Sequence, residues 1–328
     1  MRRSLIIIVS LMWMVHIIES RASASTNAKC QPYSGVGFDT DQPTLIFVVR
    51  VRQQMNDVVG QVAQAIYQTA TNTQFDTNYF SRHHLILFNN HSIIFNNRYT
   101  HTQQLLGGLL QNGLTNDTIG GCGDGVFGSI LTGLLDGAIT SQSVVYVITD
   151  SLADDDDQFD SEIQKLNSQW KATVNFFFVE PTASSGCETS MVSSGFRRYA
   201  ELANRYNGLA WHITDSAKLY DALFTQMGNL LYRTQLLLTV DRRKCTEGPV
   251  KTIQVERNSG NLVIASSGLI YPLLIDPNGQ SVTDGLEPLI LHNGSYGLWR
   301  MTDPIVGEYT IQPQFTSQTT ECSFRVYQ

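Results

Sequence analysis

The chain has 328 residues, of which 42% are hydrophobic and 16% are charged, so it is long enough to bury one large core and one smaller core. Its formal net charge is −7 at pH 7, and no block of basic residues offsets the acidic balance. Nucleic acid and anionic membranes are therefore poor candidates for partners. We expect two folded domains.

The chain starts with a basic segment, Met1 to Arg3, followed by an apolar run from Leu5 to Ile18 and then by small residues. This order is typical of a secretory signal peptide, which we assign to residues 1–23. The apolar run is short for a membrane span of about 20 residues, although an uncleaved signal anchor is the alternative. Removing three arginines and one glutamate with this segment changes the net charge from −7 to about −9. We expect a secreted, extracellular protein without membrane insertion.

Three sequons agree with export, and they make Asn90, Asn116 and Asn293 candidate glycosylation sites. Each stands in a polar setting that is typical of a turn. One sequon often arises by chance, whereas three beside a signal peptide support secretion.

Five cysteines suit disulfide formation in an oxidising compartment. We expect one disulfide in each domain, Cys122–Cys187 in the first and Cys245–Cys322 in the second, although four cysteines allow three pairings. Cys30 is then left over. It is either a free thiol or the link in a disulfide-bonded dimer.

Between Leu45 and Leu231, short apolar runs alternate with amphipathic segments. The runs are apolar on both faces, as strands covered by helices are: Leu45 to Val49, Leu85 to Phe88, Ile93 to Phe95, Val144 to Ile148, Val174 to Val179 and Leu209 to Ile213. The segments have helical spacing: Met55 to Tyr67, Val126 to Ile139, Glu162 to Trp170, Phe196 to Tyr206 and Leu219 to Leu231. Phe88 to His91 resembles a hairpin tip, which predicts one antiparallel edge. Residues 43–232, after an N-terminal segment of residues 24–42, are predicted to form a doubly wound, mostly parallel α/β sheet of the Rossmann type.

From Thr234 onward the helical periodicity disappears. Short apolar runs alternate with turn signals such as Asp276-Pro277-Asn278-Gly279 and Asp303-Pro304. The runs predicted as strands are Leu236 to Val240, Thr252 to Val255, Leu262 to Ile264, Tyr271 to Ile275, Gly297 to Met301 and Glu308 to Ile311. This pattern predicts that residues 233–328 form a small β-sandwich.

The loop after the first apolar run is the most informative stretch. Ligands of open α/β sheets sit above the carboxyl ends of the central strands, where this loop carries Arg50, Arg52 and Gln54. It holds two guanidiniums and no carboxylate. That composition argues against a metal site.

Other candidate motifs have simpler explanations. The acidic run from Asp154 to Asp157 lacks EF-hand spacing, so we interpret it as a solvated loop leading into the helix around Glu162. The glycine-rich segment from Gly120 to Gly125 lacks the Lys-Ser/Thr of a P-loop, and a tight turn tied by a disulfide suffices.

The histidines do not predict a catalytic site either. His83 and His84 precede a predicted strand, and His212 lies within one. None of the seven stands in His-Glu-x-x-His or beside a Gly-x-Ser-x-Gly elbow. We expect a structural role for each.

Several segments together resemble the von Willebrand factor A domain, specifically the version at the amino end of hemicentins with its following small β-domain. They are Leu45 to Val49 with the loop to Met55, Gly120 to Cys122 leading into Gly128 and Ile130, Val145 to Asp150, Tyr199 to Ala203, Gly208 to His212, Asp276 to Gly279 and Pro304 to Thr310. The resemblance covers about residues 45 to 320. It implies an extracellular matrix or cell-adhesion module that binds proteins.

The chain departs from this family at the metal-ion-dependent adhesion site. Family members that bind Mg²⁺ use Asp-x-Ser-x-Ser, a Thr or Asp in the middle loop and an Asp after the fourth strand. The corresponding residues here are Arg50, Arg52 and Gln54, then Gly121, and Asp150 as the one remaining carboxylate. We therefore expect a degenerate site without metal or cofactor, and hypothesise that Arg50 or Arg52 pairs with Asp150.

Three functions remain open from the sequence. We favour a secreted, non-enzymatic adhesion or matrix module with extracellular protein partners. The alternative is a secreted hydrolase-like enzyme with an unrecognised cleft at the carboxyl ends of the strands. The third possibility is that Arg50 and Arg52 grip a carboxylate or phosphate of a partner.

Overall fold

The structure is a computed structural model that describes residues 43–72, 79–118, 122–136, 139, 143–180, 194–231, 236–242, 250–257, 260–267, 270–292, 296–315 and 322–328. Residues 41–328 form one compact unit. Several sequence predictions lie outside the described residues and stay predictions, namely the signal peptide, the segment 24–42, Cys30, Gly121, Cys187, Cys245 and Asn293.

A six-stranded sheet organises the first half of this unit, in the order β3-β2-β1-β5-β7-β8. The strands are β1 (Thr44–Arg50), β2 (Arg82–Asn89), β3 (Ser92–Tyr99), β5 (Val144–Thr149), β7 (Thr173–Val179) and β8 (Ala210–Ile213). All neighbouring pairs are parallel except β2 and β3, which form the predicted hairpin with its tip at Asn90 and His91. The predicted doubly wound, mostly parallel sheet is confirmed.

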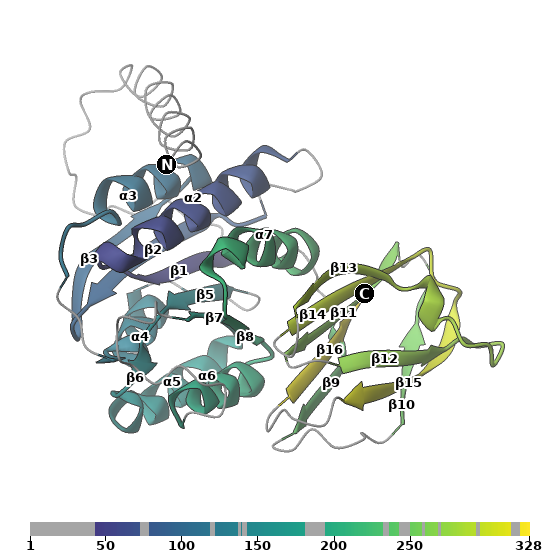
Figure 1. The fold of residues 1–328 in the computed structure, drawn as a ribbon. Coiled ribbons are helices and arrows are strands. Elements are labelled where there is room, and N and C mark those ends of the chain that lie inside the picture. The colour runs from purple at the N-terminus through teal and green to yellow at the C-terminus, as the bar shows by residue number, and fades with distance from the viewer. Residues whose placement is uncertain are drawn as a thin grey trace, which may run out of the picture. The chain divides into compact units, whose positions relative to one another are not determined.

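Helices cover both faces of the sheet (Figure 1). They are α2 (Asn56–Thr71), α3 (Thr102–Asn112) and α7 (Leu219–Leu230) on one face, and α4 (Val126–Asp136), α5 (Asp156–Trp170) and α6 (Ser194–Arg205) on the other. Alternate residues of β1 serve the two cores, because Phe47 and Val49 pack beneath the first set and Ile46 and Val48 beneath the second. This two-sided burial explains why the strands are apolar throughout.

Among the described residues, the connections also contain short strands and 3-10 helices. They are β4 (Gly123–Asp124) and β6 (Leu152–Ala153), which pair in parallel, and η1 (Gln53–Met55), η3 (Ser216–Lys218) and η4 (Thr283–Gly285).

The last third of the chain forms two antiparallel sheets. One has five strands in the order β13-β14-β11-β16-β9, and the other has three in the order β10-β15-β12. The strands are β9 (Leu236–Arg242), β10 (Lys251–Val255), β11 (Asn261–Ser267), β12 (Ile270–Ile275), β13 (Glu287–His292), β14 (Tyr296–Thr302), β15 (Gly307–Phe315) and β16 (Cys322–Tyr327). Side chains of both sheets, such as Ile264 and Trp299 from one and Ile253 and Tyr309 from the other, share one core, as in a sandwich.

The apolar core does not stop at the sandwich. Trp211 of β8 is fully buried and stacks on Tyr296 of β14, with ring centroids 4.6 Å apart. The Tyr327 hydroxyl donates a hydrogen bond of 3.4 Å to the Asn207 carbonyl. The boundary predicted at residue 233 lies outside the described residues, and the α/β part and the sandwich part of the chain share buried contacts.

Some predicted bounds were wrong. Helix α3 and strands β13 and β16 were missed, α4 ends at Asp136, and α5 begins at Asp156, ahead of Glu162. His83 and His84 lie within β2 and do not precede it, because β2 already begins at Arg82. In the described part of the chain, no helix is both long and apolar enough to cross a membrane.

Position 208 requires glycine because the backbone of β7 passes close to it. A Cβ atom at this position would lie 1.9 Å from the Val174 carbonyl oxygen, whereas a Cβ at Gly60, inside α2, would meet nothing within 4 Å. We predict that Gly208→Ala lowers the free energy of unfolding by about 2 kcal/mol or more, because β7 and β8 must separate. The matched change Gly60→Ala should raise it by about 1 kcal/mol. Urea denaturation measures both, and equal effects of the two changes would contradict the assignment.

Candidate functional site

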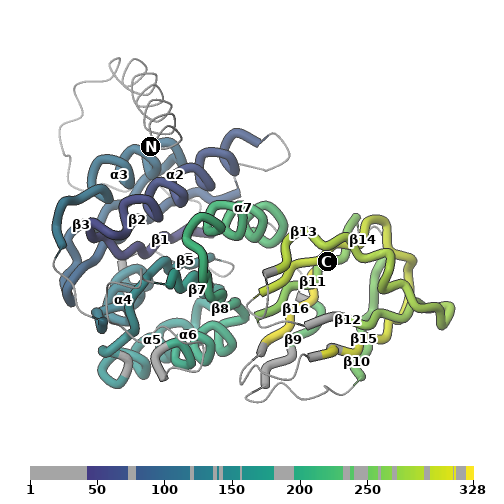
Figure 2. The backbone as a smooth tube through the Cα atoms, viewed as in Figure 1, coloured from purple at the N-terminus to yellow at the C-terminus, as the bar shows by residue number. Residues whose placement is uncertain are grey.

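The strand order reverses beside β1, which makes the carboxyl ends of β1 and β5 the topological switch point of the sheet. The two strands run side by side (Figure 2). They are parallel, and Val49 pairs with Ile148. Arg50 ends β1 and Asp150 follows β5 directly. The loops after these strands therefore bring the predicted arginines and the predicted aspartate together.

Both guanidiniums bind Asp150. Arg50 donates from Nη1 to Asp150 Oδ1 over 2.9 Å, and Arg52 donates from Nε to Asp150 Oδ2 over 2.8 Å. Arg52 Nη2 also donates to Oδ2, so this second guanidinium holds one carboxylate oxygen with two N–H groups. All three residues are buried.

Asp124 completes the cluster, and sequence analysis missed it. Its Oδ2 accepts a hydrogen bond of 2.7 Å from Arg50 Nε, and both side chains have an exposed fraction of 0%. The Asp124 carboxylate also accepts the backbone N–H groups of Asn90 at 3.2 Å, His91 at 2.6 Å and Gly125 at 2.8 Å. Asp124 therefore fastens the β2–β3 hairpin tip to the end of β1.

This result corrects the expectation that one carboxylate opposes two arginines. Two carboxylates face two guanidiniums, and the buried charges balance. The balance matters because an unpaired charge without solvent costs several kcal/mol. Gly121, which we aligned with the middle-loop ligand, lies outside the described residues, but the same loop supplies its carboxylate three residues later.

The cluster does not fit a divalent cation. Mg²⁺ requires oxygen ligands in near-octahedral geometry, and here the oxygens of Asp124 and Asp150 already accept hydrogen bonds from two permanently charged side chains. A cation among them would be repelled by both guanidiniums. Gln54, at the last position of the family pattern, is exposed on η1 and, in the part of the chain that the structure describes, forms no hydrogen bond or ion pair with the cluster.

Neighbouring groups hold the loops around the cluster. Tyr199 on α6 donates a hydrogen bond of 2.7 Å to the carbonyl of Ser151, next to Asp150. Burial raises the pKa of Tyr199 well above its usual range, so this hydroxyl stays a donor. Loop 113–118 is tied to the start of α2 because the Asn56 side chain bonds both backbone groups of Thr115.

The acidic run after Asp150 was misjudged in part. Asp155 is buried, and its carboxylate accepts the N–H groups of Phe127 at 3.0 Å and Gly128 at 2.7 Å, so it caps the first turn of α4. Burial raises its pKa, although these bonds oppose the shift. Asp154 is half-exposed and lies 3.4 Å from the His91 ring. Asp156 and Asp157 belong to the first turn of α5, so the predicted loop is confined to Asp154 within this run.

Cys122 is disulfide-bonded. Its predicted partner, Cys187, lies outside the described residues, so their pairing stays a prediction.

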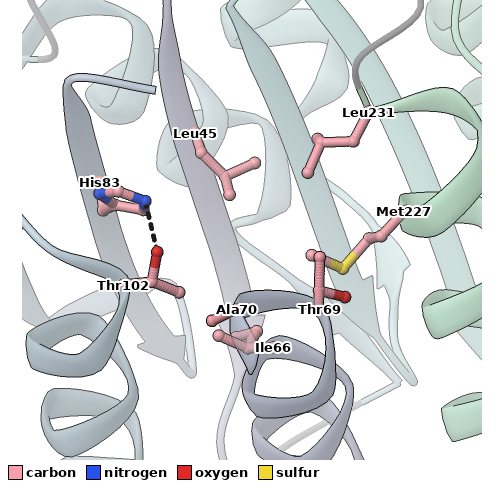
Figure 3. A pocket seen from close by; sticks show the side chains of 8 residues that line it. All are labelled: Leu45, Ile66, Thr69, Ala70, His83, Thr102, Met227 and Leu231. Carbon is pink, nitrogen blue, oxygen red and sulfur yellow. Dashed lines mark hydrogen bonds between the residues drawn. The ribbon is translucent and has the colours of Figure 1, made fainter. Parts of the chain in front are cut away.

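His83 and His84 have structural partners. The His84 ring shares a hydrogen bond of 2.6 Å with Asn96, and His83 shares one of 2.9 Å with Thr102. His83 borders a cavity of ≈ 20 Å³ between β1, α2 and α7, which has room for about one water molecule (Figure 3). Figure 3 shows Leu45, Ile66 and Met227 among its apolar lining. The cavity is too small for an organic ligand.

Comparisons with known proteins give distant similarities. No family model matches the chain. It is 26% identical over 304 residues to protein irg-7 of Caenorhabditis elegans. The aligned region covers 92% of this chain and 14% of that protein. The chain thus spans a small part of that curated relative.

Solved structures with similar folds include a von Willebrand factor type A protein from Catenulispora acidiphila, with 11% identity, a TM-score of 0.42 and coverage of 85% of this chain and 59% of that one. Proximal thread matrix protein 1 from the mussel byssus has 13% identity and a TM-score of 0.41, and the match covers 62% of this chain and 50% of that one. The pilus adhesin SpaC from Lactobacillus rhamnosus GG has 8% identity and a TM-score of 0.42, and the match covers 88% of this chain and 39% of that one.

The charge cluster predicts strong effects of single neutral substitutions. Asp124→Asn and Asp150→Asn should each lower the free energy of unfolding by about 3–5 kcal/mol, because each leaves a buried guanidinium without its counter-charge. Glu287→Gln is the matched control, since Glu287 pairs with Arg300 at the surface and should cost less than about 1 kcal/mol. Chemical denaturation tests all three. Unchanged stability of both aspartate variants would show that the cluster does not hold the loops.

His83 predicts loss of stability in acid. Burial, and then the charge of His101, lower its pKa from 6.5 to about 4. The unfolded chain therefore binds the proton first, and stability falls as the pH drops from about 6.5 to about 4, by up to about 3 kcal/mol. His83→Gln should remove this part of the pH dependence, whereas His91→Gln, at an exposed histidine, should keep it. Urea denaturation midpoints at pH 7 and pH 4 measure the effect. An equal loss of stability between these pH values in wild type and His83→Gln would refute the assignment.

Proposed function

We propose that the chain is a secreted, non-enzymatic module of the von Willebrand factor A type that binds extracellular proteins without a divalent cation. The sheet order and the position of the charge cluster at the switch point support this class. The motif resemblance along residues 45 to 320 supports it further. A hemicentin-type assignment rests on that resemblance alone.

The single observation that carries the proposal is the ion cluster. Arg50 and Arg52 occupy the place where the family pattern has metal ligands, and they satisfy Asp124 and Asp150. A guanidinium supplies directional hydrogen bonds as well as charge, so it substitutes for a cation as the element that organises the loops. The loops are then held in one arrangement whether or not a cation is in solution.

The same cluster weakens the two other candidate functions. Catalysis at the strand ends needs side chains that reach a substrate, but these four charged side chains are buried and bound to one another. A partner carboxylate or phosphate would have to compete with Asp124 and Asp150 for Arg50. Protein binding through surrounding surfaces needs neither.

Several features fit an extracellular location. The sequon residues Asn90 and Asn116 are exposed outside the helices and strands, as glycan acceptors must be. We include in the proposal the disulfides Cys122–Cys187 and Cys245–Cys322, and a free or dimer-forming Cys30. The masses of the product under reducing and non-reducing conditions, with and without glycosidase, test these modifications.

Cation independence is the direct consequence. Binding of the full chain to a panel of purified collagen, fibronectin and laminin should differ by less than about twofold between EDTA and Mg²⁺. The variant Arg50→Asp with Arg52→Ser and Gln54→Ser, which restores the Asp-x-Ser-x-Ser part of the family's ligand pattern beside Asp124 and Asp150, should instead be stabilised by Mg²⁺ in thermal unfolding. Binding by the wild type that disappears in EDTA would contradict the proposal.

A further inference from the structure

The face above the charge cluster is bordered by two sequons. Asn90 lies at the hairpin tip that Asp124 holds, and Asn116 lies in the loop whose Asp117 carbonyl accepts a hydrogen bond of 2.7 Å from Gln53 N–H. Glycans at these two residues would stand on both sides of the strand ends and hinder a protein from approaching there. A binding surface is therefore better sought elsewhere.

The turn between β14 and β15, residues 303–307, presents apolar side chains to solvent. Ile305 and Val306 are adjacent and have exposed fractions of 52% and 50%. Pro304 precedes them, and the exposed Pro277 lies beside the turn. Neighbouring apolar residues at the tip of one turn form a larger continuous patch than the single exposed residues that are normal on a protein surface.

The 303–307 turn is held at both ends. The Asp303 N–H donates a hydrogen bond of 3.1 Å to the Gly260 carbonyl. At the other end Gly307 has φ 140°, and a Cβ there would lie 2.7 Å from Pro277 Cγ, so the two turns are in close contact.

The neighbouring turn is rigid as well. The Asp276 side chain accepts the backbone N–H groups of Asn278 at 2.9 Å and Gln280 at 2.8 Å. Pro277, between them, is thereby fixed against Gly307. A partner that binds Ile305 and Val306 would thus lose little conformational entropy in this segment, which favours affinity.

Charges around the patch select the partner. Asp303 and Glu308 are exposed at its two edges, and Glu256 and Arg257 follow Val255, which pairs with Gly307. Three carboxylates and one guanidinium leave the surroundings acidic. This repels anionic lipid headgroups and favours a basic protein surface.

We infer that the 303–307 turn is the protein-docking site of this module and inserts Ile305 and Val306 into an apolar pocket rimmed by Lys or Arg on an extracellular partner. The inference rests on the proposed binding function and names the surface and the partner chemistry.

The test uses the full secreted chain and a defined probe, an amphipathic helical peptide of leucine and lysine, with a glutamate-for-lysine peptide as its control. We expect the wild type to bind the lysine peptide and the double variant Ile305→Ser with Val306→Thr to bind it at least tenfold more weakly. Asp303→Asn with Glu308→Gln should weaken binding about threefold and reduce its dependence on salt. Leu135→Ser, at an exposed leucine on α4, is the matched control and should change nothing.

Four outcomes would overturn the inference: no binding of the lysine peptide, equal binding by wild type and the Ile305/Val306 variant, a preference for phosphatidylserine vesicles, or self-association through the turn in ultracentrifugation. Unchanged thermal unfolding of the variants verifies that they are folded. Measuring each affinity in EDTA and in Mg²⁺ separates this inference from the proposed function. Turn-dependent binding that needs Mg²⁺ refutes cation independence alone, and cation-independent binding that ignores the turn refutes the docking site alone.

Discussion

The arrangement of the strand ends depends on two carboxylates shared between two guanidiniums. Asp150 binds both arginines, and Asp124 binds Arg50 together with three backbone N–H groups. These contacts join the ends of β1 and β5, the hairpin tip and the start of α4, which come from distant parts of the sequence. Neutralising four buried charges among themselves makes this possible without solvent or a cation.

The sequence predicts a strand or helix well only where the pattern of apolar residues along that element is clear. Strands buried on both faces are continuously apolar, so β1, β2, β5, β7 and β8 were found. Helix α3 was missed although Leu105, Leu106 and Leu109 share one face, because glycines and glutamines dilute its pattern. β16 was missed because its apolar residues alternate with polar ones that are also buried, such as Arg325.

The site shows a second limit. The absence of a metal at Arg50 and Arg52 stays a prediction. The pairing of these arginines with Asp150 could be predicted, because the loops after neighbouring parallel strands meet. Asp124 and Asp155 could not, because a carboxylate in a glycine-rich or acidic segment looks solvated until the fold places amide N–H groups and a guanidinium around it. Their roles depend on contacts between loops that the local sequence does not encode.

In the proposed function, internal ion pairs hold the loops, and the four buried charges are neutralised among themselves. We propose that recognition uses an outer surface instead, and the surface that we infer is the 303–307 turn, where Ile305 and Val306 are exposed.

The most direct measurement of the central claim is a titration of the full chain with Mn²⁺ followed by electron paramagnetic resonance, which counts free ions. If guanidiniums have taken the cation's place, the switch point binds no Mn²⁺. The free-Mn²⁺ signal measured with the wild type then equals the signal measured with the Asp150→Asn variant. Stoichiometric binding by the wild type that this variant loses would contradict the account.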